Sequence, residues 1–302
     1  MLIRQADVAD KKNLKELWRT VFDEEAVFLE DFFATRFQPD AVFLIEEDGK
    51  PVSALHALPV RFRDGRGMDH DAAYIVGAAT SQACRKRGYM EMLLRRLQTE
   101  ISAPILLYPA VRAYYEKNGF ASCSFSKTYD LRGQSGSGKS CERSFGGQTS
   151  AIHRTAEGNP CSASDCSASD CRDAGVALMD VAKFNLAYEA SLNRHGGLLR
   201  DETAWKFILD EYLPEIVQID APDGAAYALL RDGQAVETAA QTPRAANRLF
   251  EKLMERDITG IRAIDGSAFD DLLAGKGFSY VVQLEGMAYP TLEGNPYIGE
   301  QY

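Results

Sequence analysis

One segment of this 302-residue chain differs sharply in composition from the rest. Residues 133–174 are rich in Gly, Ser, Cys and Asp, and the sequence SASDC occurs there twice in succession, at 162–166 and 167–171. Such a stretch has too few apolar side chains to offset the entropy that a chain loses on ordering. We therefore expect a flexible linker or insertion at 133–174, which separates a folded N-terminal part, residues 1–132, from a folded C-terminal part, residues 175–302.

The charge balance limits the partners that the chain can bind. The 34 Lys and Arg residues and 44 Asp and Glu residues give a formal net charge of −10. Proteins that bind nucleic acid through its phosphates carry a basic face, so we expect no nucleic-acid partner. No stretch approaches the roughly 20 apolar residues that span a bilayer, and the N-terminus lacks the apolar core of a signal peptide. These patterns predict a cytoplasmic protein with no membrane partner.

Hydrophobic periodicity predicts the elements of the first part. Leu14, Leu17, Trp18 and Val21 recur at helical spacing, and a second helix follows around Phe28 to Phe33. An Asp-Gly turn at 48–49 joins two strands into a hairpin. The complete order is strand, two helices, three strands, helix, strand, helix and strand. It predicts an α+β fold with flanking helices around one mixed, mostly antiparallel sheet.

The second part repeats the last elements of the first. Two helices are expected at 181–193 and 201–213. They precede a strand, an Asp-Gly turn at 232–233, a strand, a helix, a strand, a helix and a final strand at 278–287. The same succession of elements in both parts suggests an internal duplication.

A strand that runs through a basic turn into a helix is the first motif with chemical meaning. The sequence GAATSQACRKRGYM at 77–90 ends the third strand of the first part and begins its next helix. Backbone N–H groups of such a turn point towards one center, and the helix dipole adds partial positive charge. Gly88 allows the backbone to approach closely. The geometry suits a pyrophosphate.

A second motif, YEKNGF at 115–120, follows one strand later. Together the two motifs resemble those of the GCN5-related N-acetyltransferase (GNAT) family. Its acyl-coenzyme A loop, Arg/Gln-x-x-Gly-x-Gly/Ala, corresponds to RKRGYM at 85–90, and its later Tyr-Glu-Lys-x-Gly-Phe motif matches at every fixed position. The resemblance implies a GNAT fold in residues 1–132 and a second, degenerate GNAT-like lobe in 175–302.

The resemblance also implies roles for individual residues. It implies that acetyl-CoA is the cosubstrate, that no metal is needed, and that a primary amine of a small molecule or peptide attacks the thioester directly. Tyr115 would then protonate the departing thiolate, since a phenol of pKa about 10 can donate to a thiolate whose conjugate acid has a pKa of about 8.5. Backbone amides would hold the thioester carbonyl near Ala78, Ala79 and Thr80, and the pyrophosphate at Arg85, Lys86, Arg87, Gly88, Tyr89 and Met90.

Two features depart from the family pattern. Met90 stands where the family has Gly or Ala, so its side chain either narrows the approach of the pyrophosphate or turns into the core. No acid follows Asp71 on the strand where relatives often carry a glutamate. Glu46, Glu47 and His56 lie on neighboring strands, but such residues are more typical of a surface or hairpin, and a water chain is an equal alternative for the base. A non-catalytic acyl-CoA-binding sensor or scaffold therefore remains the alternative function.

The second part matches the family motifs only in degenerate form. Its loop reads QTPRAA at 241–246, where Pro243 removes an N–H group, and Leu273 stands at the position of the acid. Such a tandem arrangement resembles the enhanced-intracellular-survival type of acetyltransferase. Those proteins carry a further sterol-carrier-like domain, for which this chain is too short, and a terminal aromatic residue, here Tyr302, that reaches the active site.

Three other patterns have competing interpretations. The sequence GQSGSGKS at 133–140 matches a P-loop, but no helical pattern follows it, so chance in a Gly/Ser-rich segment is favored. Cys161, Cys166 and Cys171 with His153 could bind zinc, but their spacing arises from the repeat. The third pattern is a group of acidic residues beside the first two predicted helices: Asp23, Glu24, Glu25, Glu30 and Asp31. These residues either favor a cationic amine as acceptor or form an ordinary solvated helix face.

Overall fold

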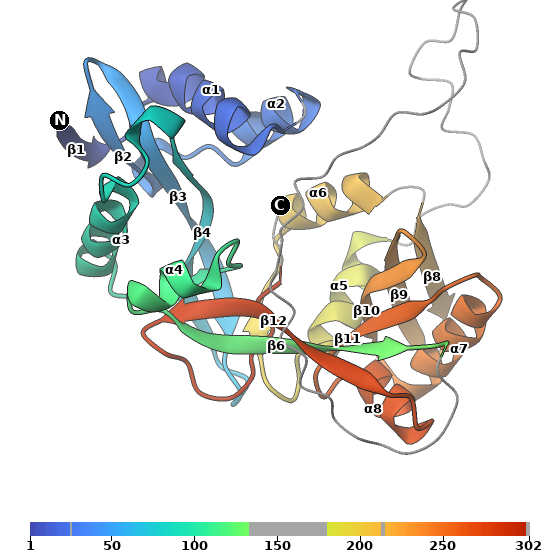
Figure 1. Ribbon diagram of the computed structural model, residues 1–302. Coiled ribbons are helices and arrows are strands. Elements are labelled where there is room, and N and C mark those ends of the chain that lie inside the picture. The colour runs from blue at the N-terminus through green and yellow to red at the C-terminus, as the bar shows by residue number, and fades with distance from the viewer. Residues whose placement is uncertain (25, 133–179, 213–214, 300–302) are drawn as a thin grey trace, which may run out of the picture.

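The computed structural model describes residues 1–24, 26–132, 180–212 and 215–299. Figure 1 shows two lobes connected by long strands. The P-loop match and the four residues of the zinc pattern lie outside the described residues, as does Tyr302. Within the described ranges, no helix has the length and apolar character needed to cross a bilayer.

The first lobe follows the predicted order of elements. Its helices are α1 (Lys11–Phe22), α2 (Ala26–Thr35), α3 (Tyr89–Glu100) and α4 (Arg112–Lys117), and short 3-10 turns lie at η1 (Val8–Asp10), η2 (Pro39–Ala41) and η3 (Gln82–Cys84). Its strands are β1 (Leu2–Gln5), β2 (Val42–Glu47), β3 (Lys50–Arg63), β4 (Asp69–Thr80), β5 (Ile105–Leu107) and β6 (Ala121–Asp130).

From its second strand onwards, the second lobe repeats the order of three strands, helix, strand, helix and strand. Its helices are α5 (Val181–Ser191), α6 (Glu202–Tyr212), α7 (Pro243–Met254) and α8 (Ala268–Gly275). Its strands are β7 (Gly197–Leu198), β8 (Ile216–Ala221), β9 (Gly224–Arg231), β10 (Gln234–Ala240), β11 (Gly260–Ile264) and β12 (Tyr280–Tyr289).

An Asp-Gly tight turn joins β2 to β3 in the first lobe and β9 to β10 in the second. Asp48 and Gly49 have φ of 51° and 73°, and Asp232 and Gly233 have φ of 52° and 70°. Two consecutive residues with positive φ form the turn whose twist matches that of paired strands, and Asp-Gly is a sequence that tolerates it. The two turns occupy different places in the order of elements, since β9 and β10 correspond to β3 and β4.

The strands form one mixed and mostly antiparallel sheet. Its order is β1-β2-β3-β4-β5-β12-β6-β11-β10-β9-β8, and β7 pairs with β3. Parallel pairing occurs between β4 and β5 and between β10 and β11, one such pair in each lobe. In both cases a helix connects the two strands, as a parallel pair requires. The predicted α+β class is confirmed.

The two lobes exchange their last strands. β12, from the C-terminal part, pairs with β5 on one side and β6 on the other, and so completes the sheet of the first lobe. β6, from the N-terminal part, also pairs with β11 and completes the sheet of the second lobe. The division at residues 1–132 and 175–302 remains a prediction about the chain, but each lobe contains a strand from both parts.

Helices cover the two faces of the first lobe separately (Figure 1). Leu14 and Trp18 of α1 and Phe32 of α2 pack on one face, where Ala288 of β12 is also buried. The opposite face buries apolar side chains of α3, together with Tyr115, Phe120 and Met287. Because β12 contributes Met287 and Ala288 to the two cores, the C-terminal strand stabilises both sides of the first lobe.

His56 of β3 lies in the first of these cores. Its side chain is fully buried among Trp18, Phe32, Phe33 and Phe37, with ring centroids 5.0 to 6.2 Å apart, and neither ring nitrogen has a hydrogen-bond partner within the described residues. Burial lowers the pKa of His56 from 6.5 to about 3. The imidazole is therefore neutral at physiological pH.

This burial predicts an acid-sensitive fold. Below pH 6.5 the unfolded chain binds a proton at His56 that the folded protein does not, so stability falls as the pH falls from 6.5 towards 3. Between pH 7 and pH 5 we expect a loss of about 2 kcal/mol from this residue. His56→Leu should remove that part of the pH dependence in denaturant titrations at the two pH values. An unchanged pH dependence in this variant would contradict the assignment.

Candidate functional site

The two central strands of the first lobe separate at the predicted site. β4 and β5 run in parallel from the pair Ala73 and Ile105 to the pair Ile75 and Leu107, where β5 ends. β4 continues to Thr80 along β3 alone. Ala78, Ala79 and Thr80, predicted to hold the thioester, therefore lie where the sheet opens beside β4.

Where the sheet opens, a β-bulge changes the direction of β4. The register with β3 shifts between the pair Ala54 and Ala79 and the pair His56 and Val76, and Gly77 in the shifted segment has φ of 61°. Ser53 holds the end of the strand, because its hydroxyl donates to the carbonyl of Ala79 at 3.2 Å and lies 2.8 Å from the hydroxyl of Thr80. Such a bulge turns backbone groups away from the regular ladder.

Gly77 also fits closely beneath α1. A Cβ atom at this position would lie 1.7 Å from Cζ2 and 2.2 Å from Cε2 of Trp18. Trp18 is only 3% exposed and packs against Phe22, Phe32 and Phe33, so it has little room to move. Only glycine satisfies both the backbone conformation and the packing at this point.

We expect Gly77→Ala to destabilise the protein by roughly 3 kcal/mol or more, since it combines a steric overlap with an unfavorable φ. Gly88→Ala is a matched control. Gly88 has φ of 79°, but a Cβ there meets nothing within 4 Å, so only the backbone strain of about 1–2 kcal/mol applies. Denaturant unfolding measures both variants. Equal destabilisation by the two would show that Trp18 does not confine Gly77.

The basic turn forms a loop in front of α3. Lys86 and Gly88 have φ of 64° and 79°, with Arg85 extended before them. Gly88 is the N-cap of α3, and among the described residues no side chain accepts a hydrogen bond from the first turn of the helix. The amides at this helix end are therefore available to an anion, which the partial positive charge of the helix end favors.

The side chains of this loop differ in what they contact. Arg85 donates from Nε to the carbonyl of Thr80 at 3.3 Å, and Lys86 is exposed. Arg87 instead binds Glu47, with distances of 2.9 and 3.0 Å. Tyr89 is buried, and Met90 packs against the core beneath α3. The side chain of Met90 thus turns into the core, the second of the two arrangements considered for it.

Tyr115 lies on α4, on the same side of the sheet as α3. Its side chain is 9% exposed and packs edge-on against Phe120 and Tyr114, with centroids 5.9 and 5.6 Å away. In the described part of the chain its hydroxyl forms no hydrogen bond. Burial raises the pKa of Tyr115 to about 12, with a smaller contribution from Tyr114. The phenol is therefore protonated at physiological pH.

The three residues considered as a base are all engaged elsewhere or enclosed. Glu46 accepts hydrogen bonds from Arg4 at 3.0 and 2.7 Å, and Glu47 binds the loop before α3. His56 is enclosed by aromatic rings. None of the three reaches the opening beside β4 as a free carboxylate or imidazole.

In the second lobe, α7 takes the place of α3, and its N-terminus is capped by a side chain. Thr242 caps α7, its hydroxyl accepts a hydrogen bond from the amide of Ala245 at 3.1 Å, and Pro243 follows it. The cap uses an amide that a phosphate would need, and proline has no N–H group to offer. Leu273, at the position of Tyr115, is fully buried. These contacts account for the degenerate motifs of this lobe.

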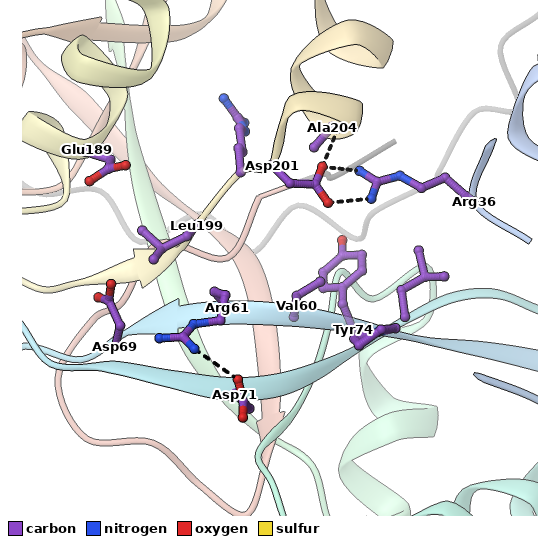
Figure 2. A pocket seen from close by; sticks show the side chains of 13 residues that line it. Arg36, Val60, Arg61, Asp69, Asp71, Tyr74, Glu189, Leu199, Asp201 and Ala204 are labelled. Carbon is purple, nitrogen blue, oxygen red and sulfur yellow. Dashed lines mark hydrogen bonds and ion pairs between the residues drawn. The ribbon is translucent and has the colours of Figure 1, made fainter. Parts of the chain in front are cut away.

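A cavity of about 420 Å³ lies on the other face of the first lobe, between β3, β4 and the segment that precedes α6 (Figure 2). Arg36 and Asp201 form a bidentate pair across it at 3.0 and 3.1 Å, and Figure 2 shows Tyr74 beneath them. Carboxylates of Asp69, Asp71 and Glu189 also line it. Over the described residues, no group of three or more His, Cys, Asp or Glu side chains is arranged to hold a metal ion.

Comparisons with known proteins address the N-terminal domain and the fold. A family model described as "Acetyltransferase (GNAT) domain" matches residues 2–123. A conserved protein of unknown function from Enterococcus faecalis is similar in structure, with a TM-score of 0.66 and 16% identity over 95% of this chain and 72% of the other. Eis1 from Mycobacterium abscessus gives a TM-score of 0.63 and 14% identity over 95% and 73%.

A GCN5-related N-acetyltransferase from Kribbella flavida is similar as well, with a TM-score of 0.62 and 18% identity over 95% of this chain and 71% of the other. No curated protein sequence matches the chain significantly. At these identities the solved structures establish a shared fold, whereas the family model identifies the N-terminal domain. Residues 2–123 therefore match the GNAT acetyltransferase domain model, and the chain shares the fold of these solved structures.

Proposed function

We propose that the first lobe binds acetyl-CoA at the opening beside β4 and transfers its acetyl group to a primary amine. The observation that carries this proposal is the open N-terminus of α3. Gly88 begins the helix without a side-chain cap, whereas Thr242 caps the corresponding helix of the second lobe. Of these two helix ends, that of α3 leaves its amides free for a diphosphate, so we assign the cosubstrate to the first lobe.

The open strand edge of β4 suits the thioester end of the cosubstrate. Ala78, Ala79 and Thr80 lie beyond the end of β5, on the strand that leads into the loop before α3. A ligand that extends from the helix end along this strand brings its carbonyl to the backbone amides there. Hydrogen bonds from those amides would stabilise the negative charge that develops on the carbonyl oxygen.

Tyr115 serves as the acid in this proposal. Attack by the amine forms a carbon–nitrogen bond and breaks the carbon–sulfur bond, and the sulfur leaves with the electron pair. The phenol, which is protonated and forms no other hydrogen bond in the described part of the chain, can supply the proton. The amine loses its own proton to water, since none of Glu46, Glu47 and His56 is free to accept it.

We assign the acceptor to the cavity between β3, β4 and the segment that precedes α6. Four carboxylates line it, and each pairs with an arginine: Asp201 with Arg36, Asp71 with Arg61, and both Asp69 and Glu189 with Arg63. An ammonium group there would share carboxylate oxygens that already accept hydrogen bonds. We propose a small molecule or peptide with a primary amine as the acceptor. Because Arg36, Arg61 and Arg200 also line the cavity, its charge does not by itself select a cationic one. On α1 and α2, the carboxylate of Glu30 is already paired with Lys15 at 2.5 Å.

Release of the free thiol of CoA, followed with acetyl-CoA and a panel of amines, tests this function. We expect turnover with at least one primary amine and none with the corresponding alcohols. One observation favors the second candidate, a sensor that only binds acyl-CoA, because the three residues considered as a base are engaged or enclosed. Tight binding of acetyl-CoA without turnover across the panel would establish the sensor and contradict the transferase.

A further inference from the structure

A carboxylate on a neighboring strand accepts hydrogen bonds from the loop in front of α3 and from the first residue of that helix. Glu47, the last residue of β2, accepts hydrogen bonds from both terminal nitrogens of Arg87 at 3.0 and 2.9 Å. It also accepts one from the hydroxyl of Tyr89, and the thiol of Cys84 lies 3.8 Å away. Cys84, Arg87 and Tyr89 thus all contact the side chain of Glu47. Glu47 itself belongs to a strand some 40 residues earlier in the chain.

The contacts are reinforced within the loop. The guanidinium of Arg87 lies over the ring of Tyr89, 4.7 Å from its centroid, and its Nη1 is 3.6 Å from Sγ of Cys84. Hydrogen bonding by Tyr89, and then by Arg87, holds the pKa of Glu47 below its ordinary value. The carboxylate is therefore charged whenever the loop is formed at physiological pH.

The loop needs an external support of this kind. It contains two residues with positive φ, Lys86 and Gly88, and lacks a side-chain cap of its own at α3. Left to itself such a segment has other backbone conformations to sample, and ordering it on binding would reduce affinity. Contacts from β2 fix both sides of Gly88 through Arg87 and Tyr89, and so keep the amides of the helix end directed at one point.

We propose that Glu47 is a positioning residue for acetyl-CoA binding, which acts by holding Arg87 and Tyr89 and through them the backbone that receives the diphosphate. This inference rests on the proposed function of the first lobe. It also assigns a different role to Arg87, whose charge is satisfied by Glu47. Among the described residues, Arg85 and Lys86 are then the exposed cations of the loop without a carboxylate partner.

Glu47→Gln tests the inference because positioning and simple electrostatics predict opposite results. Loss of a negative charge near the site would, by charge alone, strengthen the binding of an anion. Loss of the support should instead weaken it. We expect the Kd for acetyl-CoA, measured by calorimetry, and its KM to rise about tenfold, with kcat within twofold of the original value.

Glu46→Gln is the matched control. Glu46 adjoins Glu47, has the same side-chain exposure of 23%, and pairs with one arginine, Arg4, that does not belong to the loop. Glu46→Gln should leave the affinity for acetyl-CoA unchanged, although it removes an ion pair comparable to that of Glu47. Thermal unfolding of both variants checks that they are folded.

A double variant completes the test. If Glu47 acts through Arg87, Glu47→Gln combined with Arg87→Gln should weaken binding little more than either change alone. Unchanged or stronger binding in Glu47→Gln, or full additivity in the double variant, would overturn the inference. Failure of the unaltered protein to bind acetyl-CoA would instead contradict the proposed function, so the two failures are distinguishable.

Discussion

A chain that ends at residue 132 is expected not to fold into a stable first lobe. Without the C-terminal part, β5 loses β12 as its partner and β6 loses both β12 and β11. The two cores lose Met287, Ala288, Leu198 and Ile298, all of which are at most 1% exposed. Removing one large buried side chain typically costs about 2–5 kcal/mol, so losing several together exceeds the stability of an ordinary domain.

The two parts expressed together provide the control. Residues 1–132 and 175–302 in separate chains should associate, because each supplies the strand that completes the other lobe. We expect circular dichroism and amide exchange to show a folded state for the pair and an unfolded or aggregated state for the N-terminal part alone. A cooperative thermal transition in the isolated N-terminal part would contradict this account of the exchanged strands.

Tyr115→Phe is expected to lower kcat by about 100-fold or more, since positioned general acids contribute typically 10²- to 10⁴-fold. The Kd for acetyl-CoA should change little, because the side chain is held by apolar contacts that phenylalanine retains. With a pKa of about 12 the phenol is protonated across pH 6 to 9, so the loss should be the same throughout this range.

Tyr114→Phe is the control for this variant. Tyr114 is the preceding residue on α4, carries the same hydroxyl, and is 36% exposed. It should retain most of the activity in a stopped-flow or steady-state assay of thiol release. Equal rates for Tyr115→Phe and the unaltered protein would exclude the acid role.

Much of the fold could be predicted from the sequence because the signals are local. Apolar spacing indicated α1 and α3, and Asp-Gly pairs indicated the hairpin turns that both lobes form. The strand β8 was missed, because only Val217 is buried there and the segment has no clear alternation. The motif around Gly88 predicted an anion site at the start of α3, where the structure has an uncapped helix end.

What the sequence did not reveal depends on contacts between distant residues. Nothing in the pattern of β12 distinguishes pairing within its own lobe from pairing with β5, since both bury the same alternating side chains. Glu47 reads as a hairpin residue until β2 is seen beside the loop at 85–89. The burial of His56 likewise follows from four aromatic rings on α1, α2 and the segment after it, which no local pattern brings together.

The most direct test of the central claim is a calorimetric titration of the full chain with acetyl-CoA, beside one with S-acetylpantetheine, which carries the thioester but lacks the diphosphate. We predict one site per chain with micromolar affinity for acetyl-CoA, and binding of S-acetylpantetheine at least tenfold weaker, because the open end of α3 then has no anion to hold. Equal binding of the two ligands, or no binding of acetyl-CoA, would contradict the assignment of this helix end as the cosubstrate site.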